Sequence, residues 1–213
     1  GRFAAVTDAG LLEDGAVHRV SLDYDATAGL MRILVDGTVV GVGAATGTTL
    51  AAGSHDMNFG HSFDDSLDLD ALLDNFVIRD APAATGTTTP PPDSDQRIHL
   101  DFEGTAHNGV ANTIETLATR GSLDYVAGSD GQKAVFTRDD AVSVDMDIAE
   151  MYGQDAFVFE MDLALSDAGY HYILYQHMGL RLIADDGVLT FAFEDETDTT
   201  WQVSSGTDVM GVN

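Results

Sequence analysis

Short runs in which apolar and polar residues alternate recur along the chain at spacings near ten residues. Within residues 16–24, Val20 and Leu22 fall on one side of an extended strand, whereas Arg19 and Ser21 fall on the other. A period of two is typical of a strand that buries one face. Similar runs predict strands at 30–35, 38–40, 57–59, 73–79, 98–102, 134–137, 157–165, 171–175, 179–184 and 188–193.

Two pairs of these runs are separated by Asp-Gly turns. Asp36-Gly37 joins the runs at 30–35 and 38–40, and Asp185-Asp186-Gly187 joins those at 179–184 and 188–193. Asp and Gly tolerate the positive φ angles that a tight type I′ turn requires. The sequence therefore predicts a β-hairpin at each place.

Signals for helices are few. Residues 114–119 and 148–152 could form single helical turns at most, and 66–73 could form either a helical turn or a loop rich in carboxylates. The pattern predicts an all-β, antiparallel fold with two packed sheets, a β-sandwich.

A segment rich in proline and threonine divides the chain. Residues 81–96 contain all four prolines and almost no large apolar side chain, which is typical of a linker. Neither flanking block, 1–80 or 97–213, can cover its sheet edges alone. The blocks are expected either to be parts of two successive units, or to complete each other as one permuted sandwich, within a chain or between chains. The unmarked ends favour an internal piece of a longer, repetitive polypeptide.

Charge and composition exclude several classes of function. The chain has 36 acidic residues against 9 Lys and Arg, a net charge of −27, and no Cys. Such a surface does not suit nucleic acid or an anionic membrane, and no apolar run is long enough for a membrane-spanning helix. The absence of Cys excludes a disulfide scaffold. Salt or divalent cations would relieve the self-repulsion, which favours a secreted or surface protein in a marine or otherwise saline environment.

Three groups of segments together resemble a known superfamily. The first group is residues 14–37, in which Val17 stands where Trp is usual. The second is residues 72–78, and the third is the series 100–104, 128–136 and 157–161. In order and spacing they are similar to the laminin-G-like, concanavalin A-type lectin/glucanase superfamily, as it occurs in tandem in large secreted bacterial proteins of the RTX type. The resemblance implies a jelly-roll sandwich that serves extracellular recognition.

The resemblance also implies a structural calcium ion. Members of the superfamily often hold one where the opening strand, the Gly-rich step and the closing strand meet. Transferred to this chain, that position implies Glu103, Asp130 and Asp74 as ligands, because Ca²⁺ prefers carboxylate and carbonyl oxygens. With 36 acids present, the competing interpretation is a solvated Glu103 and an Asp74 that only caps a strand. The acidic stretch 64–70 lacks the Gly and Glu of an EF-hand loop and is interpreted as a solvated turn.

Aromatic residues near the C-terminus are candidates for ligand binding. Aromatic faces stack on the C–H surfaces of sugars. The sequence suggests such a platform from four residues, Tyr170, Tyr172, Tyr175 and Trp201. The alternative is that these side chains fill the core of the sandwich.

No catalytic residue is assigned. Residues 145–150, Asp-Met-Asp-Ile-Ala-Glu, are similar to the Glu-x-Asp-x-x-Glu strand of laminarinase-type hydrolases, but the first position is one methylene short and the segment precedes the expected strand. We therefore expect a non-catalytic binding or adhesion module whose partners are glycans, extracellular proteins or neighbouring copies of itself. The alternatives are a structural subunit of a filament or virion and a polysaccharide hydrolase or lyase.

Overall fold

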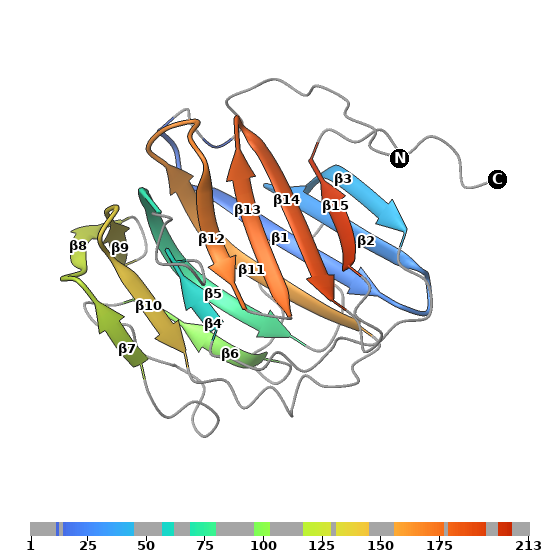
Figure 1. Cartoon of the computed structure of the whole chain (residues 1–213), viewed down its shortest axis with the longest axis horizontal. Helices are drawn as coiled ribbons and strands as arrows, with labels where there is room; N and C mark the ends of the chain where they lie inside the picture. Colours follow the sequence, from blue (N-terminus) through green and yellow to red (C-terminus); the bar gives the residue numbers. More distant parts are fainter. Residues whose placement is uncertain are drawn as a thin grey trace.

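Two antiparallel sheets stack face to face and confirm the predicted β-sandwich (Figure 1). The computed structural model describes residues 12, 15–44, 57–61, 69–79, 96–102, 117–128, 131–144, 156–176, 179–194 and 200–205. These residues form fifteen strands. Among them, no helix is long and apolar enough to cross a membrane.

One sheet has eight strands, in the order β3-β2-β1-β11-β5-β9-β8, with β6 also paired to β5. All its pairings are antiparallel. Its strands are β1 (His18–Asp25), β2 (Leu30–Val35), β3 (Thr38–Ala44), β5 (Ala71–Arg79), β6 (Gln96–Leu100), β8 (Asp124–Ala127), β9 (Gln132–Phe136) and β11 (Ala156–Leu165).

The other sheet has seven strands and lies in front in Figure 1, in the order β15-β14-β13-β12-β4-β10-β7. Its pairings are antiparallel as well. Its strands are β4 (Met57–Phe59), β7 (Leu117–Arg120), β10 (Ala141–Val144), β12 (His171–Tyr175), β13 (Leu180–Asp185), β14 (Val188–Glu194) and β15 (Thr200–Ser204).

Strands from both sides of the proline-rich segment are interleaved in both sheets. β11 lies between β1 and β5, and β4 lies between β12 and β10. The segment itself joins two neighbouring strands, since Arg79 at the end of β5 pairs with Gln96 at the start of β6. In this structure the residues before and after the segment therefore build one sandwich together.

Aromatic side chains fill the space between the sheets. Tyr24 contacts Phe157 and Phe193, with ring centroids 5.1 and 4.8 Å apart. Phe76 contacts Phe59 at 4.7 Å and thereby joins the two sheets. All five side chains are buried, as expected of alternating strands whose apolar positions face each other.

Both predicted hairpins are present. Asp36 and Gly37 have φ angles of 49° and 75°, and Asp186 and Gly187 have angles of 50° and 75°. Asp-Gly is therefore used for the positive φ of both central turn positions.

Several predictions differ from the structure. Residues 114–119 were expected to form at most a single helical turn, but Leu117–Arg120 form the strand β7, because pairing with β10 at the sheet edge outweighs the weak local signal. The last residues of 66–73 begin β5, and β6 starts two residues earlier than expected. Residues 148–152 lie outside the described residues. Three further strands were not predicted: β8, β10 and β15.

Candidate functional site

Three tyrosines gather on the outer face of the seven-stranded sheet. Tyr172 and Tyr175 lie on β12, where a register shift between Tyr172 and Leu174 turns both side chains to the same face. The ring of Tyr172 contacts those of Tyr170 and Tyr175, with centroids 5.3 and 5.5 Å apart. Tyr170 is the most exposed of the three, at 42%. We call Tyr170, Tyr172 and Tyr175 the tyrosine cluster.

Polar side chains extend this face on both sides of the tyrosine cluster. Tyr175 pairs with Arg181 of β13 on one side and with Asn58 of β4 on the other. Asn58 in turn accepts a hydrogen bond from the hydroxyl of Ser143 on β10. A guanidinium, an amide and a hydroxyl thus lie in one row beside the aromatic rings, and these side chains supply hydrogen-bonding groups next to an apolar surface.

Arg181 differs from the other placed cations. Arg19, Arg32, Arg79, Lys133 and Arg138 each form an ion pair with a carboxylate. Among the residues that the structure describes, Arg181 forms none. No carboxylate among the described residues therefore competes with a ligand for the guanidinium donors of Arg181.

The tyrosine cluster has a polar side as well as an aromatic one. Burial and a hydrogen bond with Tyr172 raise the pKa of the Tyr170 hydroxyl well above its usual range. The hydroxyl therefore stays protonated at any physiological pH and can both donate and accept hydrogen bonds.

Trp201 does not join the tyrosine cluster. It lies on β15 opposite Phe193, whose side chain is buried, and it packs against the core. Tyr175 and Trp201 therefore point to opposite faces of the same sheet. The structure brings three of the four predicted aromatic residues together and places the fourth, partly buried, on the inner face of the sheet.

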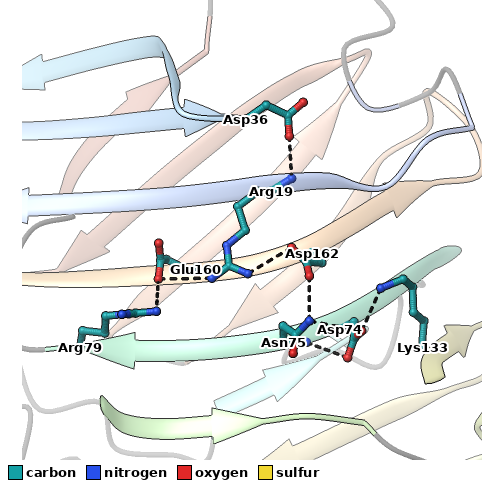
Figure 2. Close-up of polar contacts among 8 residues, drawn as sticks. All are labelled: Arg19, Asp36, Asp74, Asn75, Arg79, Lys133, Glu160 and Asp162. Carbon is teal, nitrogen blue, oxygen red and sulfur yellow. Dashed lines mark hydrogen bonds and ion pairs between the residues drawn. The ribbon is translucent and has the colours of Figure 1, made fainter. Parts of the chain in front are cut away.

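A second polar cluster lies on the outer face of the eight-stranded sheet; Figure 2 shows all of it except Asp23 and Arg32, together with Asp36. It contains four of the nine Lys and Arg residues of the chain. It crosses β2, β1, β11, β5 and β9, and most of its side chains are buried. We call it the charged network; its members are Arg19, Asp23, Arg32, Asp74, Asn75, Arg79, Lys133, Glu160 and Asp162.

Arg19 and Arg79 hold the carboxylates of β11. The Arg19 guanidinium donates to Asp162 at 3.3 Å and to Glu160 at 3.4 Å. Arg79, only 2% exposed, places Nη2 2.6 Å from Glu160 Oε2. Glu160 thus lies between two guanidinium groups, which compensate its burial.

A bulge at Asn75 organises the next part of the charged network. Asn75 has a φ of 48°, and the β5–β11 register shifts beside it, between Glu160 and Asp162. Its side-chain amide donates to Asp162 at 2.8 Å, and its backbone N–H donates to Asp74 Oδ1 at 2.9 Å. A bulge turns side chains away from their regular alternation, which lets Asn75 lie between the two acids.

Asp23 is the most strongly perturbed acid of the charged network. It is buried, and the Arg32 guanidinium lies 2.9 Å from its Oδ2. Burial raises the pKa of Asp23 to about 6, an effect that Arg32 opposes and that the nearby Glu160 reinforces. Desolvation therefore outweighs the ion pair.

The predicted calcium ligands are not brought together by the described residues. Glu103 and Asp130 lie outside them. Asp74 lies in the charged network with the Lys133 ammonium 2.9 Å from its Oδ2, which does not fit a second cation at that oxygen. No group of three or more metal-binding side chains occurs within the described ranges. A calcium site at Glu103 and Asp130 stays a prediction.

Residues 145–150 and 62–68 also lie outside the described residues, so the hydrolase-like motif and most of the acidic stretch have no structural description. The charged network was missed by sequence reasoning, although a signal was present. In β11, Glu160 and Asp162 alternate with buried apolar residues. Two acids on one face of a strand whose other residues are typical of a core indicate buried charges that need partners.

The comparisons with known proteins place the chain in no family. No protein-family model matches the sequence, and no curated protein matches it.

Proposed function

We propose that this chain is a non-catalytic, extracellular glycan-binding module that binds its ligand on the outer face of the seven-stranded sheet. The tyrosine cluster is the observation that carries the proposal. Its rings lie edge to face, and the row continues through Arg181, Asn58 and Ser143. Binding energy comes from sugar C–H groups stacked on the rings, and orientation comes from hydroxyl groups bonded to the polar side chains.

The extracellular setting is supported by charge and composition. A net charge of −27 keeps the molecule soluble in salt water, and the absence of Cys removes any dependence on the redox state of the surroundings. The resemblance to laminin-G-like and concanavalin A-type lectins supports the same proposal from the sequence.

Affinity electrophoresis in gels that contain one polysaccharide each is the test. The panel should include a β-1,3-glucan, a xylan and an alginate, so that neutral and anionic chains are compared. We expect retardation by at least one member of the panel, and about tenfold weaker binding in Tyr172→Ala and Tyr175→Ala, the loss that one stacked ring predicts.

Tyr125→Ala is the matched control, because Tyr125 is a partly buried tyrosine on β8 of the opposite sheet. Its binding should equal that of the wild type, and thermal melting should show that all variants are folded. Absence of binding to every polysaccharide, or unchanged binding in both tyrosine variants, would contradict the proposal.

A further inference from the structure

Lys133 and Asp74 face each other across two neighbouring strands. Leu73 of β5 pairs with Ala134 of β9, which places Asp74 and Lys133 opposite each other at the next position. Lys133 Nζ lies 2.9 Å from Asp74 Oδ2. The two residues are only 6% and 1% exposed, so an amine and a carboxyl group are held in contact with little access to water.

Burial favours the neutral forms of both groups. Desolvation raises the pKa of Asp74, although Lys133 and the Asn75 backbone N–H oppose the effect. Transfer of one proton from Nζ to Oδ2 turns the ion pair into a carboxylic acid and a free amine, which cost less to bury. A free amine is the nucleophilic form of lysine.

Asn75 supplies hydrogen bonds to the carboxyl group of Asp74. Its backbone N–H donates to Oδ1 at 2.9 Å, and its side-chain amide lies 3.4 Å from Oδ2. The amide is itself held by Asp162, which accepts from Arg19 (Figure 2). Preorganised donors of this kind stabilise the negative oxygen of a tetrahedral intermediate.

Gly128 positions the lysine side chain. A Cβ at Gly128 would lie 2.7 Å from Lys133 Cε and 3.3 Å from Cγ. The backbone N–H of Gly128 also donates to the Gly131 carbonyl at 2.6 Å, which fixes the position of Gly128 just before β9. A side chain at position 128 would therefore force the Lys133 side chain to shift from the position in which its Nζ reaches Asp74.

We propose that Lys133 and Asp74 form an intramolecular isopeptide bond. After the proton transfer, the Nζ lone pair attacks Cγ of the carboxylic acid, and the carbonyl electrons move to Oδ1 beside the Asn75 N–H. The ammonium proton then passes to the hydroxyl oxygen Oδ2, the C–Oδ2 bond breaks, and water leaves as the C=O bond re-forms. The products are one amide and one water, and no oxidant or cofactor takes part.

The bond would join parts of the chain that are 59 residues apart. It would connect β5 to β9 across the proline-rich segment and so tie the two blocks of the sandwich covalently. In a chain without Cys, such a cross-link supplies the constraint on the unfolded state that a disulfide supplies elsewhere.

Mass spectrometry of the purified, fully denatured chain tests the proposal. We expect an intact mass below the sequence mass by one water, and a branched peptide after proteolysis that joins the Asp74 and Lys133 segments. A cyclised Asp-Gly site, such as Asp36-Gly37, also loses water, so the branched peptide is the deciding observation.

Two variants separate the cross-link from cyclisation. In Lys133→Arg the cation is retained but the branched peptide should vanish, whereas any Asp-Gly cyclisation should persist. In Asp74→Asn no carboxylate is present to take the Nζ proton, so Lys133 keeps the unreactive ammonium form and the branched peptide should vanish as well. Gly128→Ala should slow cross-linking about tenfold or more, because it displaces the amine from its attack position.

The proposal is overturned if the wild-type chain has its full sequence mass, or if the branched peptide contains other residues. It is overturned as well if unfolded wild type yields an Lys133 that reacts with an amine-directed acylating reagent to completion.

Discussion

Gly41 of β3 lies directly against the backbone of Ser204 of β15, at the end of the sandwich where the two sheets approach each other. A Cβ at Gly41 would lie 2.5 Å from the Ser204 carbonyl oxygen and 2.9 Å from its carbonyl carbon. No flexible side chain can move aside there, because both nearest atoms belong to the backbone. Glycine at position 41 is therefore a condition for closing this edge of the core.

Gly41→Ala should lower the free energy of unfolding by about 1–3 kcal/mol, the usual cost of overpacking. Chemical denaturation followed by tryptophan fluorescence would measure it, since Trp201 lies on β15. Val39→Ala, on the same strand but exposed, is the control and should change stability much less. Equal effects of the two substitutions would contradict the close approach of β3 and β15.

The pH dependence of stability should contain a contribution from Asp23. Its pKa is about 6 in the folded state against 3.8 for an ordinary aspartate, so the folded chain binds this proton more tightly. Protonation of Asp23 therefore stabilises the fold, and its contribution to the unfolding free energy should grow as the pH falls from about 7 to about 4, by on the order of 2–3 kcal/mol in total.

Asp23→Asn should remove that contribution. Unfolding curves between pH 4 and about 7 for wild type and variant, subtracted from each other, isolate it from the titration of the other acids. Asp124→Asn on β8, an exposed position, serves as control and should leave the pH profile close to that of the wild type. A difference curve for Asp23→Asn that is flat with pH would show that the carboxyl is not perturbed.

Removing only Glu160 should destabilise the fold more than replacing Glu160 and Arg79 together by apolar residues. Loss of the carboxylate leaves a buried guanidinium without this partner, so Glu160→Leu should destabilise the fold by about 3 kcal/mol. The double variant Glu160→Leu with Arg79→Met should recover most of that loss, because it removes both charges. A double-mutant cycle in urea gives the coupling, and additive losses would show that the pair is not coupled.

The two Asp-Gly hairpins offer a matched comparison. The Asp36 carboxylate contacts His18 Nδ1 at 2.8 Å and accepts from the Arg19 backbone N–H at 3.0 Å. Asp186 has the same backbone conformation, with a φ of 50° against 49°. Asp36→Ala should therefore cost about 1 kcal/mol more than Asp186→Ala, the value of the additional hydrogen bonding. Thermal melts of both variants decide it.

The sheet content of the molecule was predictable, whereas the pairing of its strands was not. The Asp36-Gly37 turn determines its own hairpin locally, and both partners lie within a few residues. Ala71 of β5 pairs with Leu165 of β11, 94 residues away, and nothing in the sequence of β5 specifies that β11 pairs on one side while β9 and β6 share the other. β15 was missed although Trp201 and Val203 alternate correctly, because its polar neighbours resemble a turn.

The difference between local and long-range pairing also explains why the tyrosine cluster was predicted from the sequence and the charged network was not. The three tyrosines are within six residues of each other, and a single register shift beside Tyr172 completes the cluster. Asp74 and Lys133 meet only after the registers of β5 and β9 are known. Local spacing predicts a cluster on one strand, but a network across five strands requires the whole sheet.

The position of β11 between β1 and β5 determines the order in which the chain can be assembled on the ribosome. Both of its partners are synthesised before it. Until residue 165 has emerged, β1 and β5 lack the strand that separates them, and their backbone groups are open to wrong partners. The large negative charge then has a second use, because it keeps nascent chains apart during this interval.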